Sequence, residues 1–268
     1  MNFRKIVALL PAITCLAPSA AQSDGPTCLE GATPTIAFAD DFEIDQGWLS
    51  TFDGGDMTIG QWVRVDPIGT GAQPEDDHTP GMGVRCYVTG DGEGPPSTFD
   101  VDWGPVYLTS PPINLPGDGI ISYWRWFHWG GNGTADILTV QISNDDGGTW
   151  TTVEVVGGVT GWQQHAFRLS DFLPGSPAVR MRFIASDNPN DSLTEAALDD
   201  FLAIRCGVLG DTDGDGDLDL NDFHFYSDCL AGPNSNVAPP CLTVDFDGDL
   251  DVDFRDFRAL QINFTGPG

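Results

Sequence analysis

The sequence predicts a mainly β protein: a two-sheet β-sandwich, or jelly roll, followed by a small α-helical domain. Two observations lead to this prediction. From residue 36 to residue 205, short apolar or alternating runs are separated by clusters of Gly, Pro, Asn and Asp, and no segment there sustains a helical period. After Cys206 the composition changes, and an acidic segment occurs twice. We therefore expect a sandwich domain over residues 28–206 and a second domain over residues 207–268.

Nine runs in the first region have the length and alternation of β-strands. They lie at residues 61–65, 83–88, 106–108, 120–129, 137–143, 151–156, 163–169, 179–185 and 196–204. The cluster Asn-Asp-Asp-Gly-Gly at residues 144–148 lies between two of these runs and is typical of a hairpin turn. Nine or ten strands at this spacing indicate a two-sheet sandwich.

The charge balance excludes one class of partner. The chain of 268 residues carries 40 acidic and 11 basic side chains, a formal charge of −29. Binding to nucleic acid needs an excess of Lys and Arg, so nucleic acid is excluded, and an anionic membrane surface is disfavoured for the same reason. The acids are 34 Asp and six Glu, and Asp suits loops and oxygen ligation of hard cations.

The N-terminal segment predicts export. Arg4 and Lys5 precede an apolar run from Ile6 to Ala17, and the small residues around Ala21 suit cleavage by a signal peptidase. We interpret residues 1–21 as a signal peptide, because the run is shorter than the roughly 20 residues that span a bilayer. The mature protein is therefore expected to be secreted, extracellular or at the cell surface, and without a membrane span.

An odd number of cysteines remains after the predicted cleavage. These are Cys28, Cys86, Cys206, Cys229 and Cys241. In an oxidising compartment, a Cys28–Cys206 bridge would tie the first strand to the last, and a Cys229–Cys241 bridge would close a short loop. Cys86 would then be the free thiol, expected as a small buried hydrophobe. The sequence alone leaves other pairings open.

The acidic repeat has the spacing of a Ca²⁺-binding loop. Residues 211–233 and 245–267 share ten identities in 23 aligned positions, and each begins with a 12-residue loop that has carboxylates at positions 1, 3, 5 and 12. Ca²⁺ takes six to eight oxygen ligands, and a tight loop with this spacing turns alternate side chains inward. Apolar residues at position 8, Leu218 and Val252, should pack the loops together, and helices should follow over 223–230 and 257–264.

Two consequences follow from the loop sequences. The clustered Asp side chains repel one another without a cation, so folding of this region should be coupled to metal; a disordered acidic tail is the alternative. Position 6 normally needs a positive φ, and it is Gly216 in the first loop but Leu250 in the second. The second site should therefore be weaker or distorted.

On these motifs, residues 208–268 resemble a type I dockerin, a duplicated loop-helix module of secreted bacterial proteins that docks onto cohesin domains. The resemblance implies Ca²⁺ ligands at Asp211, Asp213, Asp215, Asp217 and Asp222, and at Asp245, Asp247, Asp249, Asp251 and Asp256. Cellulosomal dockerins carry a Ser-Thr pair at positions 10 and 11. Here these positions hold Leu220-Asn221 and Phe254-Arg255, which implies a partner other than a cellulosomal cohesin.

The first domain resembles non-catalytic sandwich modules of secreted bacterial peptidases and polysaccharide-degrading enzymes, of the MAM or carbohydrate-binding type. The residues that carry this resemblance lie at 40–48, 108–111, 123–126, 142–150 and 195–200. Such modules often hold a structural Ca²⁺ between the first and last strands. The resemblance implies this role for Asp41, Glu43 and Asp200, with ordinary turn and capping carboxylates as the alternative.

No catalytic motif stands out. The four His are scattered without zinc-ligand spacing, no GxSxG is present, and among so many acids a carboxylate pair carries no information. In the run 120–129, Trp124, Trp126 and His128 share one face, and Tyr123 and its alternate neighbours share the other. One face must be core. The other either offers rings for sugar stacking or, more commonly, is buried under a loop.

The leading hypothesis is a secreted, non-catalytic protein. Its Ca²⁺-dependent C-terminal module would dock to a cohesin-type partner, and its sandwich would bind a glycan, as a polysaccharide or glycoprotein, or a protein. One alternative is a dockerin-bearing carbohydrate-active hydrolase that uses a carboxylate pair. Another is an acidic surface or adhesion protein in which Ca²⁺ serves only as a staple.

Overall fold

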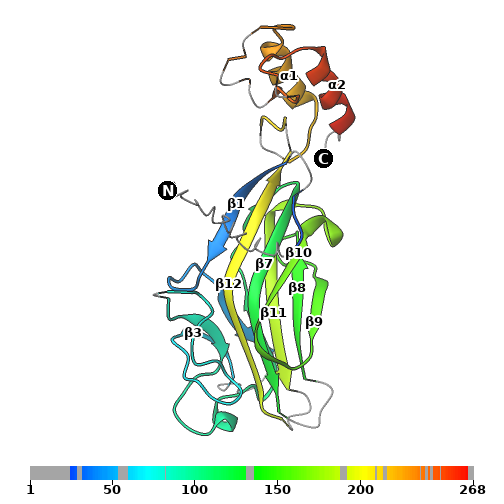
Figure 1. The fold of residues 1–268 in the computed structure, drawn as a ribbon. Helices are drawn as coiled ribbons and strands as arrows, with labels where there is room; N and C mark the ends of the chain where they lie inside the picture. Colours follow the sequence, from blue (N-terminus) through cyan, green and yellow to red (C-terminus); the bar gives the residue numbers. More distant parts are fainter. Residues whose placement is uncertain are drawn as a thin grey trace, which may run out of the picture.

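Two antiparallel six-stranded sheets form a sandwich in the computed structural model, and two helices follow at the C-terminal end (Figure 1). The described residues are 25–28, 32–53, 60–81, 83–130, 136–187, 192–208, 210–213, 216–235, 237–238, 241, 244–247 and 249–264. The predicted signal peptide, residues 1–21, lies outside them. Among the described residues, no helix has the length and apolar character to cross a membrane.

The first sheet, called sheet A, is centred on the long strand β12. Its order is β10 (Val159–Arg168), β7 (Asp118–Trp129), β12 (Thr194–Gly207), β4 (Cys86–Thr89) and β3 (Trp62–Val65). Strand β1 (Thr33–Asp40) pairs with the second half of β12, from Phe201 to Gly207, whereas β4 pairs with Ala197 and Leu198 in its first half. One edge of β12 thus serves two strands in succession.

The second sheet, called sheet B, is centred on β11. Its order is β2 (Leu49–Phe52), β5 (Trp103–Thr109), β11 (Ser176–Asp187), β8 (Ile137–Ser143) and β9 (Thr151–Val156), and β6 (Ile113–Leu115) also pairs with β11. Short 3₁₀ turns occupy Pro96–Thr98 and Leu169–Asp171. All nine predicted strands are present, and the bounds of β8 and β9 agree with the prediction. The described residues form twelve strands rather than nine or ten, since β1, β2 and β6 were not predicted.

The core lies between the two sheets. Alternate residues of β7 and β11 point inward, so Tyr123, Phe127, Met181 and Phe183 are fully buried. Arg125 also points inward, and its charge is neutralised by Glu154 on β9, with Nε–Oε1 and Nη2–Oε2 distances of 2.8 and 2.9 Å. A charge on the core face is tolerated here because it is paired and hydrogen-bonded.

Both proposed disulfides are present. Cys28 is bonded to Cys206 at the end of β12, and Cys229 is bonded to Cys241 in the helical module. Cys86 is a free, fully buried thiol on β4, and burial raises its pKa. These features agree with the cysteine analysis, and the first bridge ties the segment before β1 to the last strand of the sandwich.

The helical module has its own small core. Helices α1 (Leu220–Cys229) and α2 (Phe254–Asn263) start three residues before the predicted positions. Each start is fixed by a capping box, in which Asp219 or Asp253 caps the helix and the Asp three residues later bonds back. Leu218 and Val252 are fully buried in one cluster with Tyr226 and Leu260, so the predicted packing of position 8 is confirmed.

Candidate functional site

The first acidic loop gathers carboxylates around Asp222. Oxygens of Asp211, Asp213 and Asp222 lie within 4.8 Å of one another, and a second group with the same limit contains Asp217, Asp219 and Asp222. Asp222 is fully buried, and it accepts hydrogen bonds from the backbone N–H groups of Thr212 at 2.6 Å and Asp219 at 2.9 Å. Asp215, the predicted ligand at position 5, lies outside the described residues.

The second loop repeats this arrangement around Asp256. Oxygens of Asp245, Asp247 and Asp256 form one group within 4.8 Å, and Asp251, Asp253 and Asp256 form the other. Asp249 belongs to neither group; its Oδ2 lies 3.3 Å from Nη1 of Arg255. Burial is the first cause that raises the pKa of Asp247, and the neighbouring acids add to it. The structure thus brings positions 1, 3 and 12 together, and Asp249 lies beside Asp247, whose carboxylate accepts its backbone N–H at 3.3 Å.

The donor set in each loop fits a hard cation such as Ca²⁺. Every side-chain atom in the four groups is a carboxylate oxygen, which suits Ca²⁺ and disfavours Zn²⁺ or Cu²⁺. Asp251 is 6% exposed, and its Oδ1 has no hydrogen-bond partner among the described residues. The position 9 residues Asp219 and Asp253 were not predicted, although an Asp just before an apolar helix is a recognisable capping signal.

Position 6 adopts the predicted backbone conformation in both loops. Gly216 has φ of +96° and Leu250 has φ of +69°. In both loops the N–H of this residue donates to the position 1 carboxylate, Asp211 at 3.0 Å and Asp245 at 3.1 Å. The left-handed conformation therefore aims an N–H at the first ligand, and Leu250 carries the strain of a side chain there.

The sandwich residues predicted to hold a structural metal lie at the start of the domain and in β12. Glu43 Oε1 accepts backbone N–H groups from Val84 and Arg85, each at 2.7 Å. Asp200 Oδ2 lies 2.7 Å from Nδ1 of His78. Asp41 instead makes a local turn, accepting the N–H of Glu43 at 3.2 Å.

Asp77 connects Glu43 and Asp200. Burial raises the pKa of Asp77, and the charges of Glu43 and then Asp200 raise it further. Asp77 and Glu43 face the same glycine, since a Cβ added at Gly83 would lie 2.7 Å from Asp77 Oδ2 and 3.3 Å from Glu43 Oε1. The three carboxyl groups do not form a group within 4.8 Å among the described residues. The meeting of this loop with Glu43 was not predicted from the sequence.

The aromatic outer face of β7 is covered by the same loop. The ring of His78 stacks on Trp124 with centroids 3.6 Å apart, and Trp126 Nε1 donates to the carbonyl of Ala72 at 2.7 Å. Trp162 on β10 adds an edge contact to Trp126, with centroids 6.2 Å apart. Trp126 and Trp162 also pack against a small separate core on this side of sheet A, so the expectation of burial under a loop is confirmed.

The outward face of sheet B carries a different aromatic group. The guanidinium carbon of Arg182 on β11 lies 4.1 Å from the ring centre of Trp150 and 5.2 Å from that of Tyr107 on β5. Gln141 on β8 accepts from Arg182 Nε at 3.2 Å and Nη2 at 2.5 Å. We call these four residues the Arg182 platform. Each is half-buried, as expected for side chains on the outer face of a sheet.

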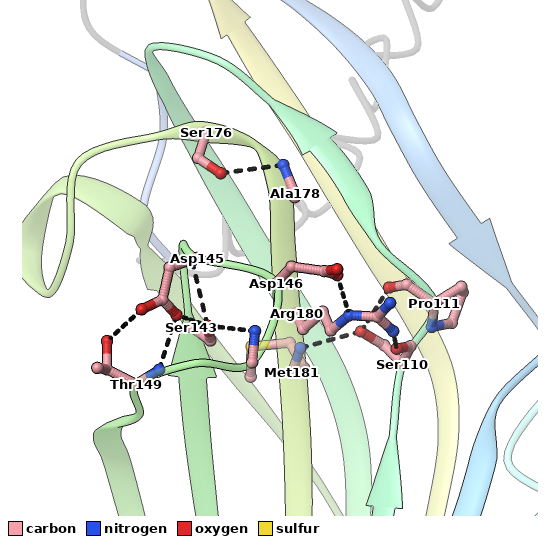
Figure 2. Close-up of polar contacts among 11 residues, drawn as sticks. Ser110, Pro111, Ser143, Asp145, Asp146, Thr149, Ser176, Ala178, Arg180 and Met181 are labelled. Carbon is pink, nitrogen blue, oxygen red and sulfur yellow. Dashed lines mark hydrogen bonds and ion pairs between the residues drawn. The ribbon is translucent and has the colours of Figure 1, made fainter.

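A rigid turn holds Trp150 in place. Figure 2 shows Asp145 accepting hydrogen bonds from Ser143 Oγ at 2.7 Å and from the N–H and hydroxyl of Thr149 at 2.8 Å. These bonds, the Thr149 N–H first, lower the pKa of Asp145 to about 2. Arg180 bonds to Asp146 across the turn at 2.6 Å. The predicted hairpin turn is present, and its hydrogen bonds fix Thr149, the residue before Trp150 of the platform.

Comparisons with known proteins found solved structures that resemble part of the chain, each with a TM-score below 0.5 and under 20% identity. No family model and no curated protein matches the chain. The K1 cleaved adhesin domain of Lys-gingipain from Porphyromonas gingivalis W83 is 17% identical, with a TM-score of 0.42, covering 66% of this chain and 99% of that domain. TmCBM61 in complex with β-1,4-galactotriose is 15% identical, with a TM-score of 0.38, covering 60% and 89%.

A third similar structure is the CBM22-1 xylan-binding domain of Paenibacillus barcinonensis Xyn10C. It is 16% identical, with a TM-score of 0.37, and the match covers 65% of this chain and 97% of that domain.

Proposed function

We propose that the sandwich is a non-catalytic glycan-binding module whose ligand lies on the Arg182 platform. The observation that carries the proposal is the position of the Arg182 guanidinium over two aromatic rings on an outward sheet face. Aromatic rings offer flat apolar surfaces to the C–H faces of a sugar, and a guanidinium and an amide offer directed hydrogen bonds to hydroxyl groups. A few polar groups among aromatic side chains is the composition expected of a small-ligand site.

Substitution on the platform tests this proposal. We expect the full chain to be retarded in gels that contain a polysaccharide, with β-1,4-galactan and xylan as the first probes. Trp150→Ala and Arg182→Gln should each weaken retention at least tenfold, because a central aromatic or Arg contributes about 2 kcal/mol. The matched control is Arg85→Gln, which removes one charge from an exposed side chain on the other sheet. Equal retention of all three variants would contradict the proposal, and turnover of the polysaccharide would favour the hydrolase alternative.

We propose further that the helical module binds one Ca²⁺ in each acidic loop. The residues that would hold the ions are Asp211, Asp213 and Asp222 with Asp217 in the first loop, and Asp245, Asp247 and Asp256 with Asp251 in the second; Asp215 and Asp249 complete the set that the loop spacing predicts. Bound Ca²⁺ supplies the positive charge that these clustered carboxylates need to lie together. Calorimetric titration of the full chain should show saturable Ca²⁺ uptake that Asp222→Asn and Asp256→Asn together abolish.

An apolar face on the two helices supports a docking role for this module. Leu220 and Phe254 are 66% and 75% exposed. They flank grooves lined by Phe223 and Phe257 from both helices. We propose that this face binds a cohesin-type protein and that the metal loops hold the helices in the binding arrangement. Capture of a cohesin domain should require Ca²⁺ and be lost in Phe254→Ser, while Arg258→Gln on the same helix, also exposed, serves as the control.

The proposed function requires export. We propose that residues 1–21 direct secretion and are removed, so that the mature chain begins at Gln22. Mass spectrometry of protein from the culture medium of an expressing bacterium measures this directly. Retention of the chain in the cytoplasm with an intact N-terminus would contradict the proposal.

A further inference from the structure

Three carboxyl groups, two of them buried, meet where β11 ends and β5 begins. Oxygens of Asp100, Asp102 and Asp187 lie within 4.8 Å of one another. Asp100 is 2% exposed and Asp187 is fully buried at the end of β11. These residues have no part in the two acidic loops, in the Glu43 corner or on the Arg182 platform.

The strand register explains why these acids meet. Asp187 is paired with Trp103, which follows Asp102 at the start of β5. On the other side of β11, Ser186 is paired with Ile137, so Asp136 lies next to Asp187 across the strands. Asp136 is 4% exposed. The end of β11 and the segments just before its two neighbours, β5 and β8, thus bring carboxylates to one end of sheet B.

Local hydrogen bonds leave oxygens of this group unsatisfied. Oδ1 of Asp100 and Oδ1 of Asp136 are buried and have no hydrogen-bond partner among the described residues. Ser192 Oγ donates to the other oxygen of Asp136 at 2.7 Å. None of the ion pairs found in the described part of the chain involves Asp100, Asp102 or Asp136. A buried carboxylate oxygen that has neither a hydrogen bond nor a counter-charge is costly unless a cation approaches it.

We propose that Asp100, Asp102 and Asp187 bind a Ca²⁺ ion that closes this end of the sandwich, with Asp136 beside it. The ligands are all carboxylate oxygens, which suits a hard cation. The site would join β5 to β11 where the ladder between them is irregular, near Ala185 and Asp187.

Tryptophan fluorescence separates this site from the loops, because all eight Trp precede Cys206. The test uses the full chain carrying Asp222→Asn and Asp256→Asn, which disable both loops. We expect millimolar Ca²⁺, relative to a chelator, to raise the midpoint of fluorescence-detected thermal unfolding by about 5 °C. Adding Asp102→Asn should abolish that shift, and adding Glu43→Gln should leave it unchanged.

Asp102→Asn is the variant chosen because it should fold. Asp102 is only half-buried, so Asp102→Asn is expected to fold even where Asp100→Asn does not. The proposal is overturned if Ca²⁺ produces no shift, if the shift persists in Asp102→Asn, or if Glu43→Gln removes it. A gain in stability of Asp102→Asn in chelator, with no response to Ca²⁺ in the parent chain, would identify shared protons instead of a metal.

Discussion

The guanidinium of Arg182 lies over the ring of Trp150 and the ring of Tyr107, with its central carbon 4.1 and 5.2 Å from their centres. The three residues come from β11, from the turn before β9 and from β5. The carboxylate of Asp53 accepts a hydrogen bond from the hydroxyl of Tyr107 at 2.6 Å, and burial followed by this bond raises the pKa of Tyr107 to about 12. A flat cation therefore contacts two rings from different strands.

The first prediction concerns the shape of that cation. Arg182→Lys keeps the charge but removes the planar fork that stacks on Trp150 and bonds to Gln141. We expect it to weaken polysaccharide retention about tenfold, close to the effect of Arg182→Gln. Affinity gels across a series of polysaccharide concentrations measure the difference. If Arg182→Lys retained full affinity, charge alone would account for the role of this residue and the stacked geometry would be irrelevant.

The second prediction concerns Leu250, whose φ of +69° is costly for a branched side chain. Its side chain is 62% exposed, so little packing is lost on truncation. Leu250→Gly should relieve about 1 kcal/mol and raise the Ca²⁺ affinity of the second loop about fivefold. Titration calorimetry of the full chain resolves this change against the wild type.

The equivalent change in the first loop should act in the opposite direction. At Gly216 a Cβ would lie 2.4 Å from the backbone N of Gly117, which follows β6 in the sandwich. Gly216→Ala should therefore weaken Ca²⁺ binding by the first loop or displace the loop from that turn.

If Leu250→Gly and wild type bound Ca²⁺ with equal affinity, backbone strain would not limit the second loop.

The sequence was sufficient to predict features that depend on local spacing. The acidic loops, the alternation of β7 and the hairpin at 144–148 follow from short-range patterns. The two cysteine pairs were one of several pairings that the sequence left open, and the structure contains that one. Strands β2 and β6 were missed because they are short, and the residues of β2 are mostly exposed. They are strands because they pair with β11 and β5, and not because their own residues favour a strand.

Sites made from residues of several strands could not be predicted from the sequence. The platform joins Tyr107, Gln141 and Arg182, and their contact depends on the order β5-β11-β8, in which β11 lies between two strands that precede it in sequence. The Asp100 group depends on the same order. A single sequence predicts strands but not which of them become neighbours, because pairing is decided by packing across the whole sheet.

The third prediction concerns the Cys28–Cys206 bridge, which closes a sequence separation of 178 residues. Replacing both cysteines by Ser should lower the free energy of unfolding by about 4 kcal/mol, mainly by freeing the unfolded chain. Urea unfolding followed by tryptophan fluorescence measures the loss. The control replaces Cys229 and Cys241, whose separation is 12 residues, and should leave this transition unchanged because the helical module contains no Trp.

The last prediction concerns Glu195, which is 1% exposed on β12 and accepts a hydrogen bond from Thr89 Oγ1 at 2.9 Å. Burial raises its pKa from 4.5 to about 9; the Thr89 bond opposes this, and Asp100 and Asp91 add to it. Because the folded pKa is the higher one, the unfolded chain loses this proton first. Stability is therefore fully present below pH 4.5 and declines as the pH rises toward 9.

Glu195→Gln should remove that decline. We expect the variant to be more stable than wild type at pH 7 by at most about 3 kcal/mol, and equal to it at about pH 4. Glu154→Gln is the matched control with the opposite sign, because it leaves Arg125 buried without its partner and should destabilise the sandwich by about 3 kcal/mol. Urea unfolding of both variants and wild type at pH 4 and pH 7 measures these differences in the free energy of unfolding. A Glu195→Gln chain that is less stable than wild type at pH 7 would mean that this carboxyl is ionised in the fold and stabilised by a counter-charge.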